Sequence, residues 1–215
     1  MMTLSKRRLN PAKSDAIIAA AKALFLKHGY SETTMDAIAL KAGLTKQTVY
    51  SYYSNKEILF TEMVLGLCAG LSRSDTKNTP DNASFETLLT HNGLKLLELI
   101  TSAEVLATTR LVIAESERYP KLAKLYYERG TQELVQIIAE FLDGQNKRGV
   151  VAIPNTLSAA SYFLAMLKGQ YYLRMILRVK PLPSEQSKIA HVKDTVKIFM
   201  RLYADKHPLN TSSIL

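Results

Sequence analysis

Cysteine occurs only once in this 215-residue chain, at Cys68, and long apolar runs are missing. A single cysteine excludes a disulfide within the chain and is typical of a reducing compartment. Because Cys68 stands in an apolar stretch, residues 63–71, the sequence predicts a buried structural thiol. No stretch approaches the roughly 20 apolar residues needed to cross a bilayer. No apolar run follows the basic N-terminus, as a signal peptide would require. These absences predict a soluble, cytoplasmic protein with no membrane partner.

Catalytic and cofactor-binding patterns are also absent. The sequence contains no GxxxxGK[ST], GxGxxG, HExxH, GxSxG or CxxC pattern. The four histidines are scattered, with no carboxylate or cysteine at metal-ligand spacing: His28, His91, His191 and His207. We therefore expect no enzyme, no catalytic residue, no metal and no cofactor.

Positive charge is concentrated towards the N-terminus. The net charge is +9, and residues 1–60 hold nine Lys and Arg against four Asp and Glu, a net of +5. The other 155 residues hold 19 against 15, a net of only +4. Such an imbalance indicates a polyanionic partner for the N-terminal part. A solvated basic surface without a partner is the alternative reading of the same composition.

The apolar pattern is helical throughout and predicts an all-α protein of about nine helices. Residues 150–153 are the best strand candidate, but they lie between Gly149 and Pro154 and are better explained as a connection. Helix starts are predicted at Asn10-Pro11, at a capping box of Thr33 with Asp36, at Thr45, and at Ser54 with Glu57. Stops are predicted at Gly29 and Gly43. Later helices are expected over 85–101, 103–117, 121–142, 156–178 and 185–204.

Three domains follow from this pattern. A three-helix head covers 1–54, a connecting helix covers 55–72, and a helical body covers 73–215. The polar, proline-containing residues 72–84 predict a loop between the connecting helix and the body.

Ala39, Gly43 and Val49 have the spacing of a helix-turn-helix. A small residue is needed where the second helix crosses the first, and glycine supplies the positive φ of the turn. Val49 then anchors the second helix to the core. The triple predicts a DNA-binding motif within the head.

Around this motif, residues 24–60 read LFLKHGYSETTMDAIALKAGLTKQTVYSYYSNKEILF, which closely resembles the signature of the TetR family of transcription regulators. The matching elements are Leu24-Phe25, Gly29, Thr34, Ile38-Ala39, Ala42-Gly43, Thr48-Val49-Tyr50, Tyr53, Lys56-Glu57 and Leu59-Phe60. The resemblance implies a helix-turn-helix head that binds double-stranded operator DNA, with the third helix in the major groove.

The same resemblance implies the DNA contacts. The third helix would present Thr45, Lys46, Gln47, Thr48 and Ser51 to the DNA. Lys46 has the chemistry to reach guanine and Gln47 to pair with adenine. Phosphate contacts are implied for Tyr50, for Lys56 at the start of the fourth helix, and for Thr34 at the start of the second.

Several of these residues have a structural alternative. Tyr50, Tyr52 and Tyr53 form an aromatic cluster that could pack the head, and packing is the better explanation for Tyr53. For Tyr50 a DNA contact is favoured, whereas Tyr52 fits either role. Residues 6–8, Lys-Arg-Arg, fit a DNA-binding arm or a solvated terminus equally well.

The last two long helices predict a homodimer. The helix over 156–178 is apolar almost all round, so it must be covered on two sides. In the family, the corresponding pair of helices forms a four-helix dimer interface. The candidate interface residues are Phe163, Leu167, Val196 and Phe199, and the alternative is a larger core within one chain.

Residues 110–130 resemble the AefR-like or AcrR-like branch of the family, which implies a small hydrophobic or cationic effector. Candidate pocket residues are Arg110, Tyr126, Phe163 and Met166. Arg110, Glu115, Glu117 and Arg118 could also bind an effector, but ion pairs at helical spacing are the favoured explanation. Aromatic and methionine side chains at helical spacing are more often core.

The sequence is therefore interpreted as a dimeric DNA-binding repressor, released from its operator by a small lipophilic effector. A rival hypothesis is a helical ligand-binding or scaffold protein whose head no longer binds operator DNA. Intact Lys46, Tyr50 and Lys56 argue against that rival. Activation of transcription is a further alternative that the sequence does not separate from repression.

Overall fold

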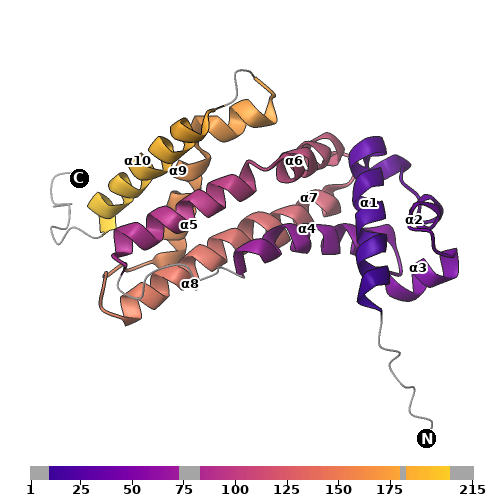
Figure 1. The fold of residues 1–215 in the computed structure, drawn as a ribbon, viewed down its shortest axis with the longest axis horizontal. Helices are drawn as coiled ribbons and strands as arrows, with labels where there is room; N and C mark the ends of the chain where they lie inside the picture. The colour runs from indigo at the N-terminus through magenta and orange to yellow at the C-terminus, as the bar shows by residue number, and fades with distance from the viewer. Residues whose placement is uncertain (1–9, 73–82, 180–182, 204–215) are drawn as a thin grey trace, which may run out of the picture. The chain divides into compact units, whose positions relative to one another are not determined.

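Every regular element that the structure, a computed structural model, describes is a helix (Figure 1). The description covers residues 10–72, 83–179 and 183–203. Within these residues the helices are α1 (Pro11–Glu32), α2 (Met35–Lys41), α3 (Lys46–Tyr52), α4 (Lys56–Ser72), α5 (Phe85–Ile100), α6 (Ala103–Glu115), α7 (Pro120–Tyr126), the π-helical segment η2 (Tyr127–Gln132), α8 (Glu133–Lys147), α9 (Thr156–Ile176) and α10 (Glu185–Tyr203). The all-α prediction is confirmed.

The chain forms two compact units that do not follow the order of the sequence. Unit 1 contains the described residues up to Gly66 together with Thr108–Arg129. Unit 2 contains the described residues of Leu67–Ala107 and those from Gly130 onward. The chain therefore passes between the units inside α4, inside α6 and inside η2. The functional division at 54/55 and 72/73 stays a prediction.

The helices of unit 1 begin at side-chain caps. Asn10 accepts a hydrogen bond from the main-chain nitrogen of Ala12, with Pro11 in the first turn, as predicted. Thr45 caps α3 by accepting from the nitrogen of Thr48, also as predicted.

Two predicted caps are shifted by one residue. Thr34, and not Thr33, caps α2, because its side chain accepts from Ala37. Thr33 is buried and donates to the carbonyl oxygen of Gly29. At α4 the side chain of Asn55, one residue after Ser54, accepts from the nitrogen of Ile58. At both starts two neighbouring residues are able to cap, and sequence alone does not choose between them.

The core of unit 1 joins α1–α4 to the segment Thr108–Arg129. Phe25, Leu59 and Phe60 are fully buried in it, and Phe25 and Phe60 meet edge to face. Val112 of α6 and Leu122 of α7 are buried in the same cluster. Residues 108–129, which follow the head by more than 40 positions, are thus part of its core.

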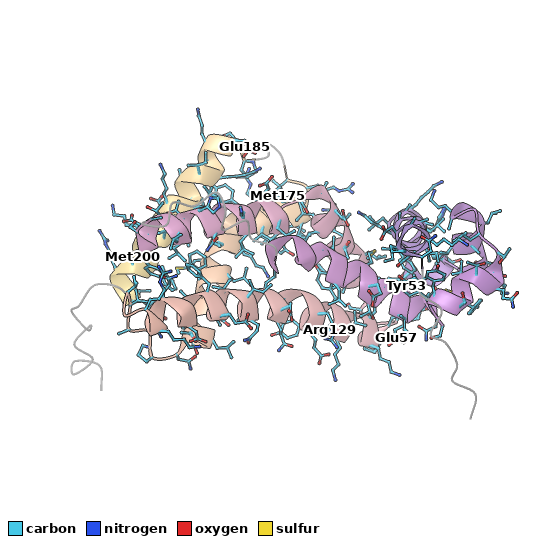
Figure 2. The ribbon with its side chains drawn as sticks, turned by 60° about the horizontal axis from the view of Figure 1, so that its bottom comes forward. Tyr53, Glu57, Arg129, Met175, Glu185 and Met200 are labelled. Carbon is cyan, nitrogen blue, oxygen red and sulfur yellow. The ribbon has the colours of Figure 1, made fainter. Side chains whose placement is uncertain are left out.

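Unit 2 is built around α5, α8, α9 and α10, with α8 against α9 and α10 against α5 as its main pairs. Its core contains Phe163 and Phe199, whose rings meet edge to face at 5.3 Å. Figure 2 labels Glu185 and Met200, which lie towards opposite ends of α10.

Two expected helices differ from the prediction. The helix expected over 121–142 is divided into α7, η2 and α8. A π-helical turn inserts a residue into the helical repeat and rotates the buried face. Leu122 therefore packs in the core of unit 1, whereas Leu134 and Ile138 pack in that of unit 2. α9 is interrupted at Gly169, where φ is 41° and ψ is −152°.

Some predictions fall outside the described residues: the arm at residues 6–8, the side chain of Cys68, and most of the loop at 72–84. Among the helices that are described, none is long and apolar enough to span a membrane.

Candidate nucleic-acid interface

The helix-turn-helix has the geometry that its three key residues predict. Ala39 is buried where α2 meets α3, and Val49 is fully buried. Gly43 adopts φ 66°, a left-handed conformation that glycine reaches without strain. The nitrogen of Leu44 donates to the carbonyl oxygen of Ala39 at 3.0 Å and closes the turn. This packing fixes which face of α3 is exposed.

Most of the predicted DNA contacts lie on the surface of α2 and α3. The exposed ones are Thr34, Thr45, Lys46, Gln47, Tyr50 and Ser51. Thr48 is half-buried, and its hydroxyl lies 2.8 Å from that of Thr45. Ser51 donates to the carbonyl oxygen of Thr48 and still has lone pairs for another partner. A stretch of α3 thus offers a cation, an amide and several hydroxyls on one side.

Lys46 has a partner in the free protein. Its ammonium lies 2.8 Å from the Asp36 carboxylate and 6.0 Å from the centre of the Tyr50 ring. The hydrogen bond to Asp36 raises the pKa of Lys46, so this residue remains a cation. Tyr50 itself is 44% exposed, which leaves its hydroxyl available for a phosphate.

The other two tyrosines connect α3 to α1. Tyr53 is buried, its hydroxyl lies 2.7 Å from that of Ser14, and burial raises its pKa. The hydroxyl of Tyr52 accepts from the main-chain nitrogen of Asn10 at 2.9 Å. Figure 2 shows Tyr53 near Glu57, where α3 leads into α4. Tyr52 and Tyr53 therefore have hydrogen-bond partners within the head, whereas Tyr50 is exposed on its surface.

Lys56, for which a phosphate contact was predicted, has its ammonium engaged within the protein. It donates to the carbonyl oxygens of Tyr30 at 2.7 Å, Ser31 at 3.0 Å and Thr33 at 3.1 Å. It also lies 4.5 Å from the centre of the Tyr30 ring. An ammonium has three N–H donors, and here each has a carbonyl partner.

The sequence did not reveal that Glu115 and Tyr119 contact the head. Glu115 accepts a hydrogen bond from the main-chain nitrogen of Ser31 at 3.1 Å, and the hydroxyl of Tyr119 lies 3.2 Å from that of Ser31. The rings of Tyr119 and Tyr30 meet edge to face at 5.2 Å. Burial, with Glu57, Tyr119 and Glu115 adding to it, raises the pKa of Tyr30 to about 12. The only signal in the sequence was the charge of Glu115 at the end of a helix.

The four predicted dimer-interface residues lie in the core of the protomer. Phe163, Leu167, Val196 and Phe199 are all 0–1% exposed. Because a side chain with no exposed surface has nothing to offer a second subunit, these residues are corrected to core positions. Their exposed neighbours on α9 and α10 are the available surface.

The predicted effector-pocket residues are divided between the units. Arg110 and Tyr126 belong to unit 1, where the Tyr126 hydroxyl lies 2.7 Å from that of Thr109. Phe163 and Met166 belong to unit 2, where Phe163 is buried and Met166 packs against the same core. Among the residues that are described, no group of three or more His, Cys, Asp or Glu is placed to hold a metal ion.

The chain matches two family models. Residues 17–63 match the model of bacterial regulatory proteins of the tetR family, and residues 87–205 match the C-terminal domain of AefR-like transcriptional repressors.

Individual relatives agree with these matches. The uncharacterised HTH-type transcriptional regulator YvkB of Bacillus subtilis (strain 168) is 27% identical over 79% of this chain and 88% of its own. A putative TetR-family regulator from Mesorhizobium loti MAFF303099 is 30% identical with a TM-score of 0.77, covering 90% of this chain and 97% of its own. The flavonoid-responsive regulator FrrA is 30% identical with a TM-score of 0.76, covering 92% of this chain and all of its own.

Proposed function

Because the chain belongs to the TetR family and is a DNA-binding transcriptional regulator, we propose that it is a repressor that a small lipophilic molecule releases from its operator. Its relatives and family matches are transcriptional regulators, and the chain is not an enzyme. The observation that carries the proposal is the exposed polar face of α3, held in place by buried Ala39 and Val49.

α3 reads bases in the major groove. The Lys46 ammonium donates to guanine O6 or N7, and the Gln47 amide pairs with adenine N6 and N7. Tyr50 and Thr34 contact phosphates on either side of the groove, and Thr45, Thr48 and Ser51 add hydroxyl contacts. Each base contact contributes about 1–3 kcal/mol of discrimination between sequences.

A genomic footprint of the bound sites tests the proposal directly. We expect short palindromic sites upstream of genes whose transcription rises when the regulator is deleted. Binding-site selection with Gln47→Ala should relax one position of each half-site, whereas Lys41→Ala, which changes an exposed residue of α2, should leave the consensus unchanged. If no sequence is enriched, the chain is a scaffold rather than a DNA reader, and if transcription falls on deletion it is an activator.

The regulator acts as a homodimer, in which two heads bind half-sites about 34–36 Å apart. Large apolar side chains lie exposed on α9, at Tyr162 and Leu173, and on α10, at Ile198 and Leu202. Burial of such side chains against a second copy removes apolar surface from water, which favours association. α9 and α10 pack against each other, so we propose that their exposed side chains form one surface.

The effector is proposed to be lipophilic and aromatic. FrrA, to which the chain is 30% identical, is described as flavonoid-responsive. The Glu115 carboxylate accepts a hydrogen bond from the main-chain nitrogen of Ser31, so we assign it to the head and not to the effector site. Arg110 and Tyr126, which both belong to unit 1, are proposed to contact the effector.

Release requires the effector to bind one conformation of the dimer more tightly than another in which the two heads are spaced differently. An effector with equal affinity for both conformations shifts no equilibrium. α4 carries the chain out of unit 1. We propose that α4 acts as a lever, because its movement would change the spacing between the two heads. Titration of flavonoids and other lipophilic compounds against the protein–operator complex, with the mass monitored, tests this. We expect release of an intact dimer into solution. We also propose that the regulator is cytoplasmic, where its operator lies. Release as monomers contradicts the lever, and no response to the whole library contradicts the effector.

A further inference from the structure

Residues 29–33, here called the Gly29 turn, connect α1 to the helix-turn-helix. Gly29 interrupts α1 with φ 87° and ψ 166°. Thr34, the cap of α2, follows directly after Thr33. The conformation of this turn therefore sets how α2 leaves α1.

Lys56 holds one side of the Gly29 turn. Its ammonium donates hydrogen bonds to the carbonyl oxygens of Tyr30, Ser31 and Thr33. The Tyr30 ring also packs against this ammonium. The negative ends of the last peptide dipoles of a helix favour a cation at this position. The cation thus closes the end of α1.

Glu115 holds the other side of the same turn. Its carboxylate accepts from the nitrogen of Ser31, and a Cβ atom placed on Gly29 would lie 3.1 Å from its Oε1 atom. The carbonyl oxygens of the turn thus accept hydrogen bonds from Lys56 of α4, and one of its N–H groups donates to Glu115 of α6. Each charge is matched to the opposite end of the peptide dipoles.

We propose that Lys56 and Glu115 are positioning residues for operator binding: they touch no DNA, and together they hold the Gly29 turn so that α2 and α3 meet the groove. The proposal rests on the proposed DNA-binding function of α3. It differs from a phosphate contact at Lys56, because a phosphate would have to replace one of three carbonyl partners already in place.

Salt dependence separates the two roles of Lys56. Removal of a cation that contacts phosphate reduces the log–log slope of affinity against salt by roughly 0.9. For Lys56→Met we expect operator affinity to fall about tenfold, because the Gly29 turn loses the cation that holds its carbonyl oxygens, with the salt slope unchanged. Lys46→Ala, which removes an exposed cation from the face proposed to meet DNA, is the comparison and should instead relax the preference for one base pair. A slope that falls by roughly 0.9 in Lys56→Met overturns the proposal.

Glu115 is tested with and without DNA. Glu115→Ala should weaken operator binding about tenfold and speed amide hydrogen exchange at Ser31, because that N–H loses its acceptor. Glu115→Gln keeps an acceptor oxygen and should restore both values, while Glu117→Ala, an exposed neighbour, should change neither. Unchanged exchange at Ser31 in Glu115→Ala, or unchanged operator affinity in that variant, overturns the proposal.

The exchange experiment is made on the free protein. It therefore separates a failure of the positioning proposal from a failure of the proposed function. Wild-type protein that binds no operator, with Ser31 still protected through Glu115, would reject DNA binding and with it the positioning role, while leaving the contact between Glu115 and the turn intact.

Discussion

Asp36 on α2 and Lys46 on α3 lie 2.8 Å apart, measured from the carboxylate oxygen Oδ1 to the ammonium nitrogen. Both side chains are more than 60% exposed, so solvent screens the pair and its contribution to folding is small. The pair lies on the face proposed to meet DNA. Lys46 must therefore either leave Asp36 when it binds a base or use its remaining N–H group.

Asp36→Asn should raise the affinity for DNA of any sequence. The substitution removes a negative charge that faces phosphates and releases Lys46 for non-specific contacts, so the ratio of operator to non-specific affinity should fall. The log–log salt slope should steepen by up to roughly 0.9 if Lys46 gains a phosphate. Fluorescence anisotropy with operator and scrambled DNA measures both quantities.

Asp15→Asn makes the same change of charge on the exposed surface of α1 and serves as the control. An equal effect of the two substitutions would attribute the result to net charge and not to the release of Lys46.

Gly29→Ala should destabilise the protein by about 1–3 kcal/mol, because the backbone conformation at this position is essentially restricted to glycine. The added Cβ would also meet the Glu115 carboxylate. Chemical denaturation monitored by circular dichroism gives the free energy of unfolding.

Gly66→Ala is the matched control for that substitution. Gly66 lies in α4 with nothing within 4 Å of an added Cβ, so the change should stabilise the helix by up to about 1 kcal/mol. A loss of stability at Gly66 as large as that at Gly29 would remove the conformational explanation.

Alkaline pH should destabilise the wild-type protein through Tyr30. Its pKa is raised from 10.0 to about 12 in the folded state, so between these values the folded state binds the phenolic proton and the unfolded state loses it. The stability contributed by the neutral phenol is present below pH 10 and is lost as pH rises towards 12. The loss is about 1.4 kcal/mol per pH unit above 10.

Tyr30→Phe lacks the titrating group and is the reference. The free energies of unfolding of the two proteins, measured in urea at pH 9 and pH 11, should converge or cross as pH rises. Parallel pH profiles would show that another group causes the alkaline loss.

Leu202→Glu on α10 should convert the dimer to monomers without unfolding the protomer, because Leu202 is 47% exposed on the proposed dimer surface. Val196→Glu, six residues earlier on the same helix and 1% exposed, should instead unfold unit 2. Sedimentation velocity with circular dichroism distinguishes the two outcomes. Val150→Glu, an exposed apolar residue of the α8–α9 connection, is the control. A dimer that survives Leu202→Glu would place the interface elsewhere.

Local chemistry determined much of the fold from the sequence alone. The cap at Asn10, the cap at Thr45 and the positive φ of Gly43 each depend on residues within a few positions of one another. The same applies to the spacing of Ala39 and Val49, which predicts the helix-turn-helix. Such short-range constraints recur wherever the pattern occurs, so a sequence is sufficient to state them.

Only the tertiary structure decided the partners that come from distant parts of the chain. Apolar periodicity marks Phe163 and Phe199 as buried, but whether the chain's own helices or a second copy bury them depends on how α5, α9 and α10 pack. Charge marks Lys56 and Glu115 as polar groups, but a lysine suits a phosphate and a carbonyl oxygen equally well. The hydrogen bond between Ser31 and Glu115 joins residues 84 positions apart, and no local pattern encodes such a contact. The sequence thus determined the DNA-reading motif, while long-range packing determined what holds it in place.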